Sequence, residues 1–116
     1  MKIKLLIKSH FDAAHFLPGY DGDCSRIHGH RWKVEFEFVG DVSAETGMLR
    51  DFKELKCWTG SLLPDHRLIN DWWPAIIPTA ENIAYKLYQI LEPGLHILKR
   101  VTVWETEECG ASYPAE

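Results

Sequence analysis

Three histidines have a spacing that could hold a metal ion. His28 and His30 flank Gly29, and residues two apart in an extended chain point to the same side. His15 lies at the end of an earlier segment, and an antiparallel hairpin would bring that end beside His28. Imidazoles suit zinc, and three protein ligands leave a fourth position for water or substrate, as in catalytic sites. The same spacing also fits unrelated histidines that make ordinary hydrogen bonds.

Cys24 lies four residues before His28, where a bound metal and nearby cations would favour the thiolate. A thiolate at that place could move protons on carbon. Alternatively, Cys24 could be the fourth ligand, which would close the coordination shell and make the zinc a structural staple. The other two cysteines, Cys57 and Cys109, have no such neighbours and are predicted to be small packing residues.

Two acidic positions could complete a site. Asp65 precedes His66, and a carboxylate can fix the tautomer of an imidazole and raise its basicity, as in general acid–base sites. Taken alone, this dipeptide favours a solvated turn.

Glu105 continues the face of Val101 and Val103, where the pattern calls for an apolar residue, and a buried carboxylate needs partners. It could accept two adjacent N–H donors of a ligand, or it could be a strand-end glutamate in water.

Alternation with a period of two residues predicts the strands that carry the histidines. Apolar residues alternate with polar ones from Lys2 to Lys8 and again, more strongly, from Trp32 to Phe38. The segment from Pro18 to Asp23 is rich in glycine and aspartate and predicts a long loop between them. We therefore expect a long antiparallel hairpin.

Helical patterns follow the hairpin. Asp51 can cap a first helix and Thr79 a second one, which Pro93 ends. Alternation over 101–105 then predicts a third strand, with a short fourth strand around Ser112. The order ββααββ predicts an α+β domain in which two helices cover one face of a four-stranded antiparallel sheet.

Composition limits the class of protein. The 116 residues fit a single domain over 1–116, and a net charge of −4 disfavours a nucleic-acid partner. Three cysteines cannot all pair in one chain, which indicates a reducing compartment. The first residues lack the apolar run of a secretory signal, and no later stretch could span a bilayer. We expect a cytoplasmic protein without nucleic-acid or membrane partners that acts on a small molecule and self-assembles to cover its sheet edges.

Six short motifs follow one another along the chain. They are Phe11-Asp12-Ala13-Ala14-His15, Cys24-Ser25-Arg26-Ile27-His28-Gly29-His30, Thr46-Gly47-Met48 with Asp51-Phe52, Asp65-His66 with Asn70, Pro78-Thr79-Ala80-Glu81-Asn82, and Glu105-Thr106. In kind and order they resemble the 6-pyruvoyl-tetrahydropterin synthase and 6-carboxy-tetrahydropterin synthase superfamily, and the likeness runs nearly from end to end. The compact chain and the Cys-x-x-x-His-Gly-His spacing look most like the bacterial carboxy enzymes of queuosine biosynthesis.

The resemblance implies a role for each candidate residue. His15, His28 and His30 would bind zinc, Cys24 would be the catalytic thiol, Asp65 and His66 its proton-relay partners, Glu105 the pterin anchor, and Thr79 a residue near the pterin. It also implies the tunnelling fold, or T-fold, whose trimers join their sheets in a barrel and usually stack in pairs as hexamers with active sites between subunits. Pro64 departs from the family pattern, which usually has leucine before the Asp-His pair, and the helix from Phe52 looks slightly short.

The implied reaction is the zinc-dependent conversion of 7,8-dihydroneopterin triphosphate to 6-carboxy-5,6,7,8-tetrahydropterin, with release of triphosphate and acetaldehyde. In the pyruvoyl branch of the superfamily, triphosphate is eliminated without side-chain cleavage. A further variant cleaves the side chain to a hydroxymethyl pterin. The rival hypotheses from other classes are a non-catalytic, zinc-stapled oligomer that binds a pterin or purine, and a plain scaffold without metal.

Overall fold

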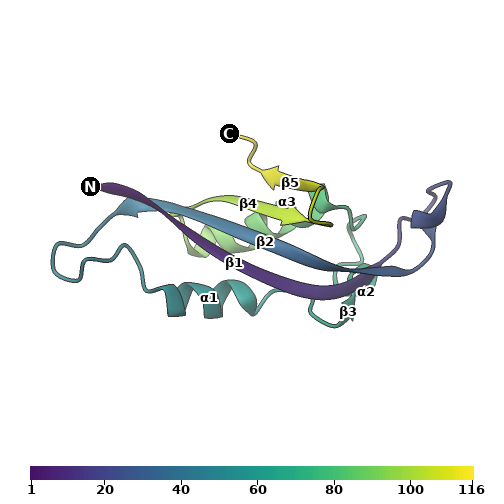
Figure 1. Cartoon of the computed structure of the whole chain (residues 1–116), viewed down its shortest axis with the longest axis horizontal. Helices are drawn as coiled ribbons and strands as arrows, with labels where there is room; N and C mark the ends of the chain where they lie inside the picture. The colour runs from purple at the N-terminus through teal and green to yellow at the C-terminus, as the bar shows by residue number, and fades with distance from the viewer.

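The computed structural model describes the whole chain, residues 1–116. Two long strands come first, followed by three helices, with the short strand β3 between the first two, and then by two further strands (Figure 1). In chain order the elements are β1 (Lys2–His15), a 3₁₀ turn (Asp23–Ser25), β2 (His28–Asp41), α1 (Phe52–Gly60), β3 (Arg67–Leu68), α2 (Ile69–Trp72), α3 (Ala80–Leu91), a second 3₁₀ turn (Glu92–Gly94), β4 (Leu98–Trp104) and β5 (Gly110–Tyr113).

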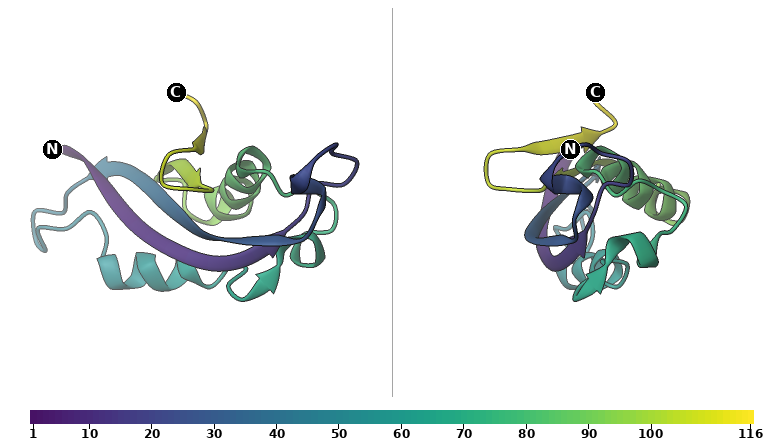
Figure 2. Two further views of the ribbon diagram at one scale, coloured as in Figure 1. Left: turned by 45° about the vertical axis from the view of Figure 1, so that its right-hand side comes forward. Right: turned by 90° about the vertical axis from the view of Figure 1, so that its right-hand side faces the viewer.

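The hairpin of β1 and β2 sets the length of the molecule. Its antiparallel register runs from Lys2 opposite Asp41 to His15 opposite His28. β1 is longer than the predicted strand because the alternation resumes after Ser9 and His10, and the side chains of Phe11, Ala13 and His15 are all buried. Figure 2 shows the strong curvature of this hairpin, with β5 on the opposite side of it from α1 in both views.

The sheet corrects two sequence predictions. It has five strands in the order β3-β1-β2-β4-β5 and is mixed, because β3 pairs parallel to β1 with Arg67 opposite Ala13. A third helix, α2, separates β3 from α3. Both elements are too short to produce a periodic sequence pattern, since β3 has two residues and α2 has four. The predictions of four antiparallel strands and of the order ββααββ were therefore wrong, whereas the α+β class with one sheet is confirmed.

One face of the sheet carries the core. On β2, Trp32, Val34, Phe36 and Phe38 are at most 1% exposed and meet buried residues of all three helices. Burial of each such aromatic side chain contributes on the order of 2–3 kcal/mol. The opposite face, called the open face below, carries polar side chains of β1 and β2: Lys8, His10, Asp12, Arg31, Lys33 and Glu35.

Both predicted helix caps are present. The Asp51 side chain accepts a hydrogen bond from the N–H of Lys53, and the Thr79 hydroxyl accepts one from the N–H of Asn82. The cap at Thr79 fixes the N-terminus of α3 beside the end of the hairpin. None of the helices has the length and apolar character needed to cross a membrane.

Candidate metal centre and catalytic site

The hairpin brings the three predicted histidines together at the end that carries the β1–β2 loop. His15 and His28 are register partners, and His30 lies two residues along β2 on the same side. The nitrogen atoms with which the three rings could bind a metal all lie within 4.8 Å of one another. The ring centroids of His15 and His28 are 4.5 Å apart. The sequence prediction of a convergent triad therefore agrees with the geometry.

Backbone carbonyls orient two of these rings. Nδ1 of His15 lies 2.7 Å from the Pro78 carbonyl oxygen, and Nδ1 of His28 lies 2.7 Å from the Arg26 carbonyl oxygen. Because a carbonyl only accepts, Nδ1 carries the proton in both rings and Nε2 keeps its lone pair. This is the arrangement that fixes the tautomer of metal-binding histidines.

The unused nitrogens test whether a metal fits. Nε2 of His15 and Nε2 of His30 are buried and have no hydrogen-bond partner. Burial, more than the nearby His28 ring, lowers the pKa of both side chains below the usual histidine value, which favours the neutral, metal-binding form. Buried acceptors without partners are rare in folded proteins. A divalent cation that prefers nitrogen ligands, such as zinc, fits this donor set.

Glu105 lies one residue beyond β4 and faces the triad. Its carboxylate oxygens are 3.8 Å from Nε2 of His15 and 3.9 Å from Nε2 of His30, and its side chain is 35% exposed. The sequence allowed either a buried carboxylate that binds a ligand or a strand-end glutamate in water. The observed exposure of the Glu105 side chain lies between these two expectations. Glu105 and Thr79 line the same cavity of about 530 Å³.

Cys109 also lines this cavity, and the sequence prediction for it was wrong. Cys57 and Cys109 are both exposed rather than packed. The carbonyl of Cys109 accepts a hydrogen bond from the N–H of Glu105 at 3.0 Å, which closes the turn between β4 and β5. Because backbone groups close this turn, no residue pattern indicated that the Cys109 side chain would be exposed.

Cys24 is half-buried in the 3₁₀ turn between β1 and β2. The backbone N–H of Leu17 donates to the Cys24 carbonyl at 2.7 Å, which holds this loop closed on the end of the hairpin. The sulfur is not among the ligand atoms that lie within 4.8 Å of one another in the histidine group. This geometry favours three histidine ligands with an open position over a closed shell that includes the thiolate.

Asp65 and His66 form a pair at the β3 edge of the sheet. Oδ2 of Asp65 is 3.0 Å from Nδ1 of His66, and both side chains are more than half exposed. The N–H of Asp12 donates to Asp65, and that bond, ahead of the one from His66, lowers the pKa of the Asp65 carboxyl. No hydrogen bond or ion pair joins this pair to Cys24 or to the histidine triad. The structure therefore makes the predicted pair but does not link it to the thiol of its own chain.

Asn70 links helix α2 to Phe16, the residue directly after β1. Its side-chain amide accepts from the N–H of Phe16 and donates to the Phe16 carbonyl, both at 3.0 Å. The amide thus imitates a paired strand at the residue that follows His15. This contact positions the metal-site end of β1 rather than contributing a ligand.

Comparison with known proteins identifies the family. A family model described as 6-pyruvoyl tetrahydropterin synthase matches residues 4–116, and the chain belongs to this family. A Synechocystis protein named 6-carboxy-5,6,7,8-tetrahydropterin synthase is 38% identical over 114 residues, covering 89% of this chain and 86% of that protein. A Pyrococcus furiosus protein named dihydroneopterin monophosphate aldolase is 31% identical over 115 residues, covering 95% and 96% of the two chains.

A solved structure shows the same fold. The 6-pyruvoyl tetrahydropterin synthase of Caenorhabditis elegans matches with a TM-score of 0.87 at 24% identity, covering 97% of this chain and 95% of that one. The family resemblance and the T-fold of the single chain, both expected from the sequence, are thereby confirmed.

Proposed function

We propose that this protein is a zinc-dependent 6-carboxy-5,6,7,8-tetrahydropterin synthase. It would convert 7,8-dihydroneopterin triphosphate and one water molecule to the carboxypterin, triphosphate and acetaldehyde, as a cytoplasmic step of queuosine biosynthesis. Family membership and the name of the Synechocystis relative support the reaction class. The observation that carries the zinc requirement is the pair of buried, unpartnered Nε2 atoms of His15 and His30.

Each residue of the site has a task in this reaction. His15, His28 and His30 would hold zinc, which when bound supplies a Lewis acid that polarises the side-chain oxygens of the substrate. Cys24 accepts and returns the proton of the neighbouring C–H as a thiolate. The Glu105 carboxylate accepts the ring N–H and the exocyclic amine of the pterin, and this bidentate contact orients the side chain toward the metal.

The location of Asp65 and His66 supports active sites shared between subunits. The pair lies at an exposed edge of the sheet and has no hydrogen bond to Cys24 of its own chain. Exposed strand edges favour pairing with further copies. We therefore include in the proposal a trimer or a dimer of trimers, with a barrel of joined sheets, in which each Asp65–His66 pair relays protons for the thiol of a neighbour.

Product identification tests the function. Zinc-loaded protein is incubated with 7,8-dihydroneopterin triphosphate, and the products are identified by mass. The expected products are the carboxypterin, triphosphate and acetaldehyde. A pyruvoyl pterin with no acetaldehyde would replace this proposal with the pyruvoyl branch, and an unchanged substrate would support a binding protein.

Two cysteine variants separate catalysis from a structural zinc site. Cys24→Ala should retain one zinc per subunit and lose turnover by at least about 100-fold. A site in which Cys24 is a fourth ligand should instead lose metal affinity and stability. Cys57→Ala, on the exposed side of α1, is the matched control and should behave as the wild type.

A second candidate is side-chain cleavage that leaves a hydroxymethyl pterin. The Pyrococcus furiosus relative, whose name is that of an aldolase for dihydroneopterin monophosphate, matches nearly the whole of both chains. Parallel assays with dihydroneopterin monophosphate and triphosphate distinguish the two candidates. A hydroxymethyl pterin with glycolaldehyde phosphate, formed from the monophosphate, would favour the aldolase.

A further inference from the structure

The backbone of Asp12 holds both members of the Asp65–His66 pair. Its N–H donates to Oδ1 of Asp65 at 2.9 Å, and its carbonyl oxygen accepts from the N–H of His66 at 2.7 Å. His66 has a φ of 58°, in the left-handed region that disfavours residues other than glycine. These two bonds offset the backbone strain and hold the pair in one orientation. They also attach the pair to β1 at Asp12, three residues before His15.

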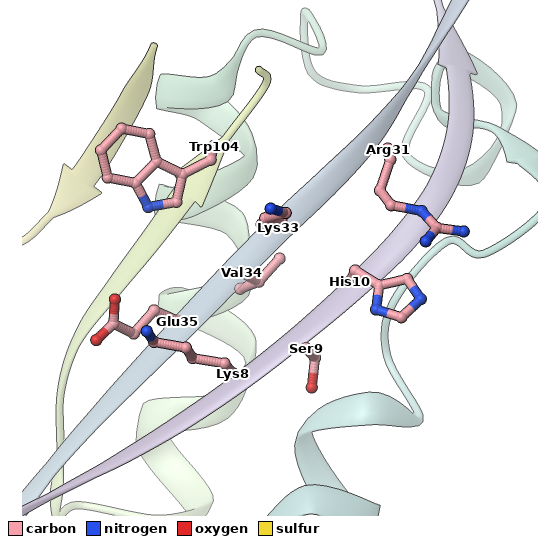
Figure 3. Close-up of a pocket in the computed structure, with 8 residues that line it drawn as sticks. All are labelled: Lys8, Ser9, His10, Arg31, Lys33, Val34, Glu35 and Trp104. Atoms are coloured by element: carbon pink, nitrogen blue, oxygen red, sulfur yellow. The ribbon is translucent and has the colours of Figure 1, made fainter. Parts of the chain in front are cut away.

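Arg31 of β2 binds the Asp12 side chain from the neighbouring strand. The two residues are register partners, with Nε 2.9 Å from Oδ1 and Nη2 3.0 Å from Oδ2. This bidentate geometry satisfies both carboxylate oxygens and fixes their plane. Figure 3 shows the open face, where Arg31 lies near His10 and Lys33 is further along β2, around a cavity of about 390 Å³. Other titratable or charged side chains near the pair come from β1, β3 and α2: His10, Arg67 and Asp71.

The ion pair of Arg31 and Asp12 does more than join β1 and β2, because it also neutralises a carboxylate beside Asp65. The ligand atoms of Asp12, Asp65 and His66 lie within 4.8 Å of one another, so an uncompensated Asp12 carboxylate would repel that of Asp65. The hydrogen-bonded Arg31 guanidinium lowers the pKa of Asp12. Since an arginine already covers Asp12 and both Asp65 oxygens have partners, the group does not offer a cation free ligands. The cluster therefore suits the hydrogen-bonded pair of the Asp65 carboxylate and the His66 imidazole better than a second metal ion.

We propose that Arg31 is a positioning residue for the Asp65–His66 pair: it neutralises and fixes Asp12, whose backbone holds the pair. This role rests on the proposed proton relay by Asp65 and His66. Arg31 acts through Asp12: its guanidinium offsets the Asp12 charge beside the Asp65 carboxylate and fixes the residue whose N–H and carbonyl oxygen hold the pair. Loss of the guanidinium would leave two like charges side by side and loosen the orientation of His66.

Zinc-loaded full-length variants test this role with dihydroneopterin triphosphate as substrate. Arg31→Met should lower kcat about tenfold while KM changes less than about twofold, because a misplaced relay slows the proton transfer and not binding. The double variant Asp12→Asn/Arg31→Met should recover to within about threefold of wild-type kcat, since the uncompensated charge is removed and the Asp12 backbone groups remain. Arg31→Gln is a second variant with the same expectation should Arg31→Met fold poorly. Lys33→Met is the matched control, because Lys33 is a cation of the same strand and face that pairs with Glu107 instead.

The possible outcomes separate this role from the proposed function. An Arg31→Met enzyme as active as Lys33→Met, or a double variant as slow as the single one, would overturn the positioning role. Loss of zinc in Arg31→Met would also overturn it, since the effect would then pass through the adjacent His30. A wild-type protein without turnover would overturn the proposed reaction itself. Reduced kcat with full zinc content and recovery in the double variant would support the positioning role.

Discussion

Two clusters of metal-binding residue types each include one residue of β1, His15 in the first and Asp12 in the second, and they differ in how their polar atoms are satisfied. In the first, His15, His28 and His30 are partly or fully buried, and two of their nitrogens have no partner. In the second, Asp12, Asp65 and His66 are largely exposed, and their carboxylates are bonded to N–H groups and a guanidinium. Proximity alone would make both clusters metal sites. The difference shows that spare lone pairs, and not crowding, distinguish a ligand set from a proton-relay network.

Electrostatics separates the clusters in the same way. Burial lowers the pKa of His15 and His30, which favours neutral rings that can bind a cation. Hydrogen bonds lower the pKa of Asp12 and Asp65, which favours charged groups that already have donors. The first cluster gains by adding a positive ion, and the second already holds one in Arg31.

The largest expected effect comes from removing one histidine from each cluster. His28→Ala should reduce bound zinc from one per subunit to below about a tenth and lower kcat by at least about 1,000-fold. His66→Ala should keep its zinc and lower kcat about 100-fold. Elemental analysis and steady-state kinetics measure the two quantities. If His66→Ala lost zinc as readily as His28→Ala, the division of the clusters would be wrong.

Metal removal should destabilise the chain through the first cluster alone. Zinc at a thousandfold excess over its Kd stabilises the folded state by about 4 kcal/mol, so chelation should lower Tm by on the order of 10 °C. Calorimetry before and after chelation measures the shift, and added zinc should restore it. The same addition should leave Tm unchanged in His28→Ala, and a restored Tm in that variant would place the ion elsewhere.

In metal-free protein, the two clusters should also lose their contributions to folding stability in different pH ranges. Because the folded-state pKa of His15 and His30 is lowered, the unfolded chain binds more protons, and stability falls as pH drops below about 6.5. The lowered pKa of Asp12 and Asp65 gives stability that is present above about pH 4 and is lost below it. Urea unfolding from pH 8 to pH 3 should show both losses. Asp12→Asn should reduce only the acidic one, and a change near pH 6 in that variant would contradict the assignment.

The first cluster was predictable because its geometry follows from local patterns. The alternation in β1 and β2 fixes which side chains share a face, and pairing of the hairpin then brings His15 opposite His28. The capped helix at Thr79 could likewise be predicted from its residue types. These features depend on neighbours in sequence or on one long, strongly periodic pair of strands.

The second cluster depends on contacts that no sequence pattern shows. β3 forms because Arg67 and Leu68 pair with β1, and two contacts hold the ends of this segment: the His66 N–H bonds the Asp12 carbonyl, and the Asn70 side chain bonds Phe16. Asp12 acts through its own N–H and carbonyl, and residue type does not show which backbone groups a distant segment will use. The exposure of Cys109 was missed for the same reason, since the turn that presents it is closed by backbone bonds to Glu105 and Thr106.

The smallest expected effect tests whether the buried cluster depends on α3. Thr79 caps this helix, and the preceding carbonyl, that of Pro78, orients the His15 ring. Thr79→Ala should lower the free energy of unfolding by about 1 kcal/mol and weaken zinc binding by less than about tenfold, because the carbonyl is held less firmly. Thr79→Ser, which keeps the capping hydroxyl, should retain both quantities. Urea unfolding and competition with a chelator measure them. A raised KM in Thr79→Ser with normal stability would instead show that the threonine methyl group contacts the pterin, which is the second role predicted for this residue.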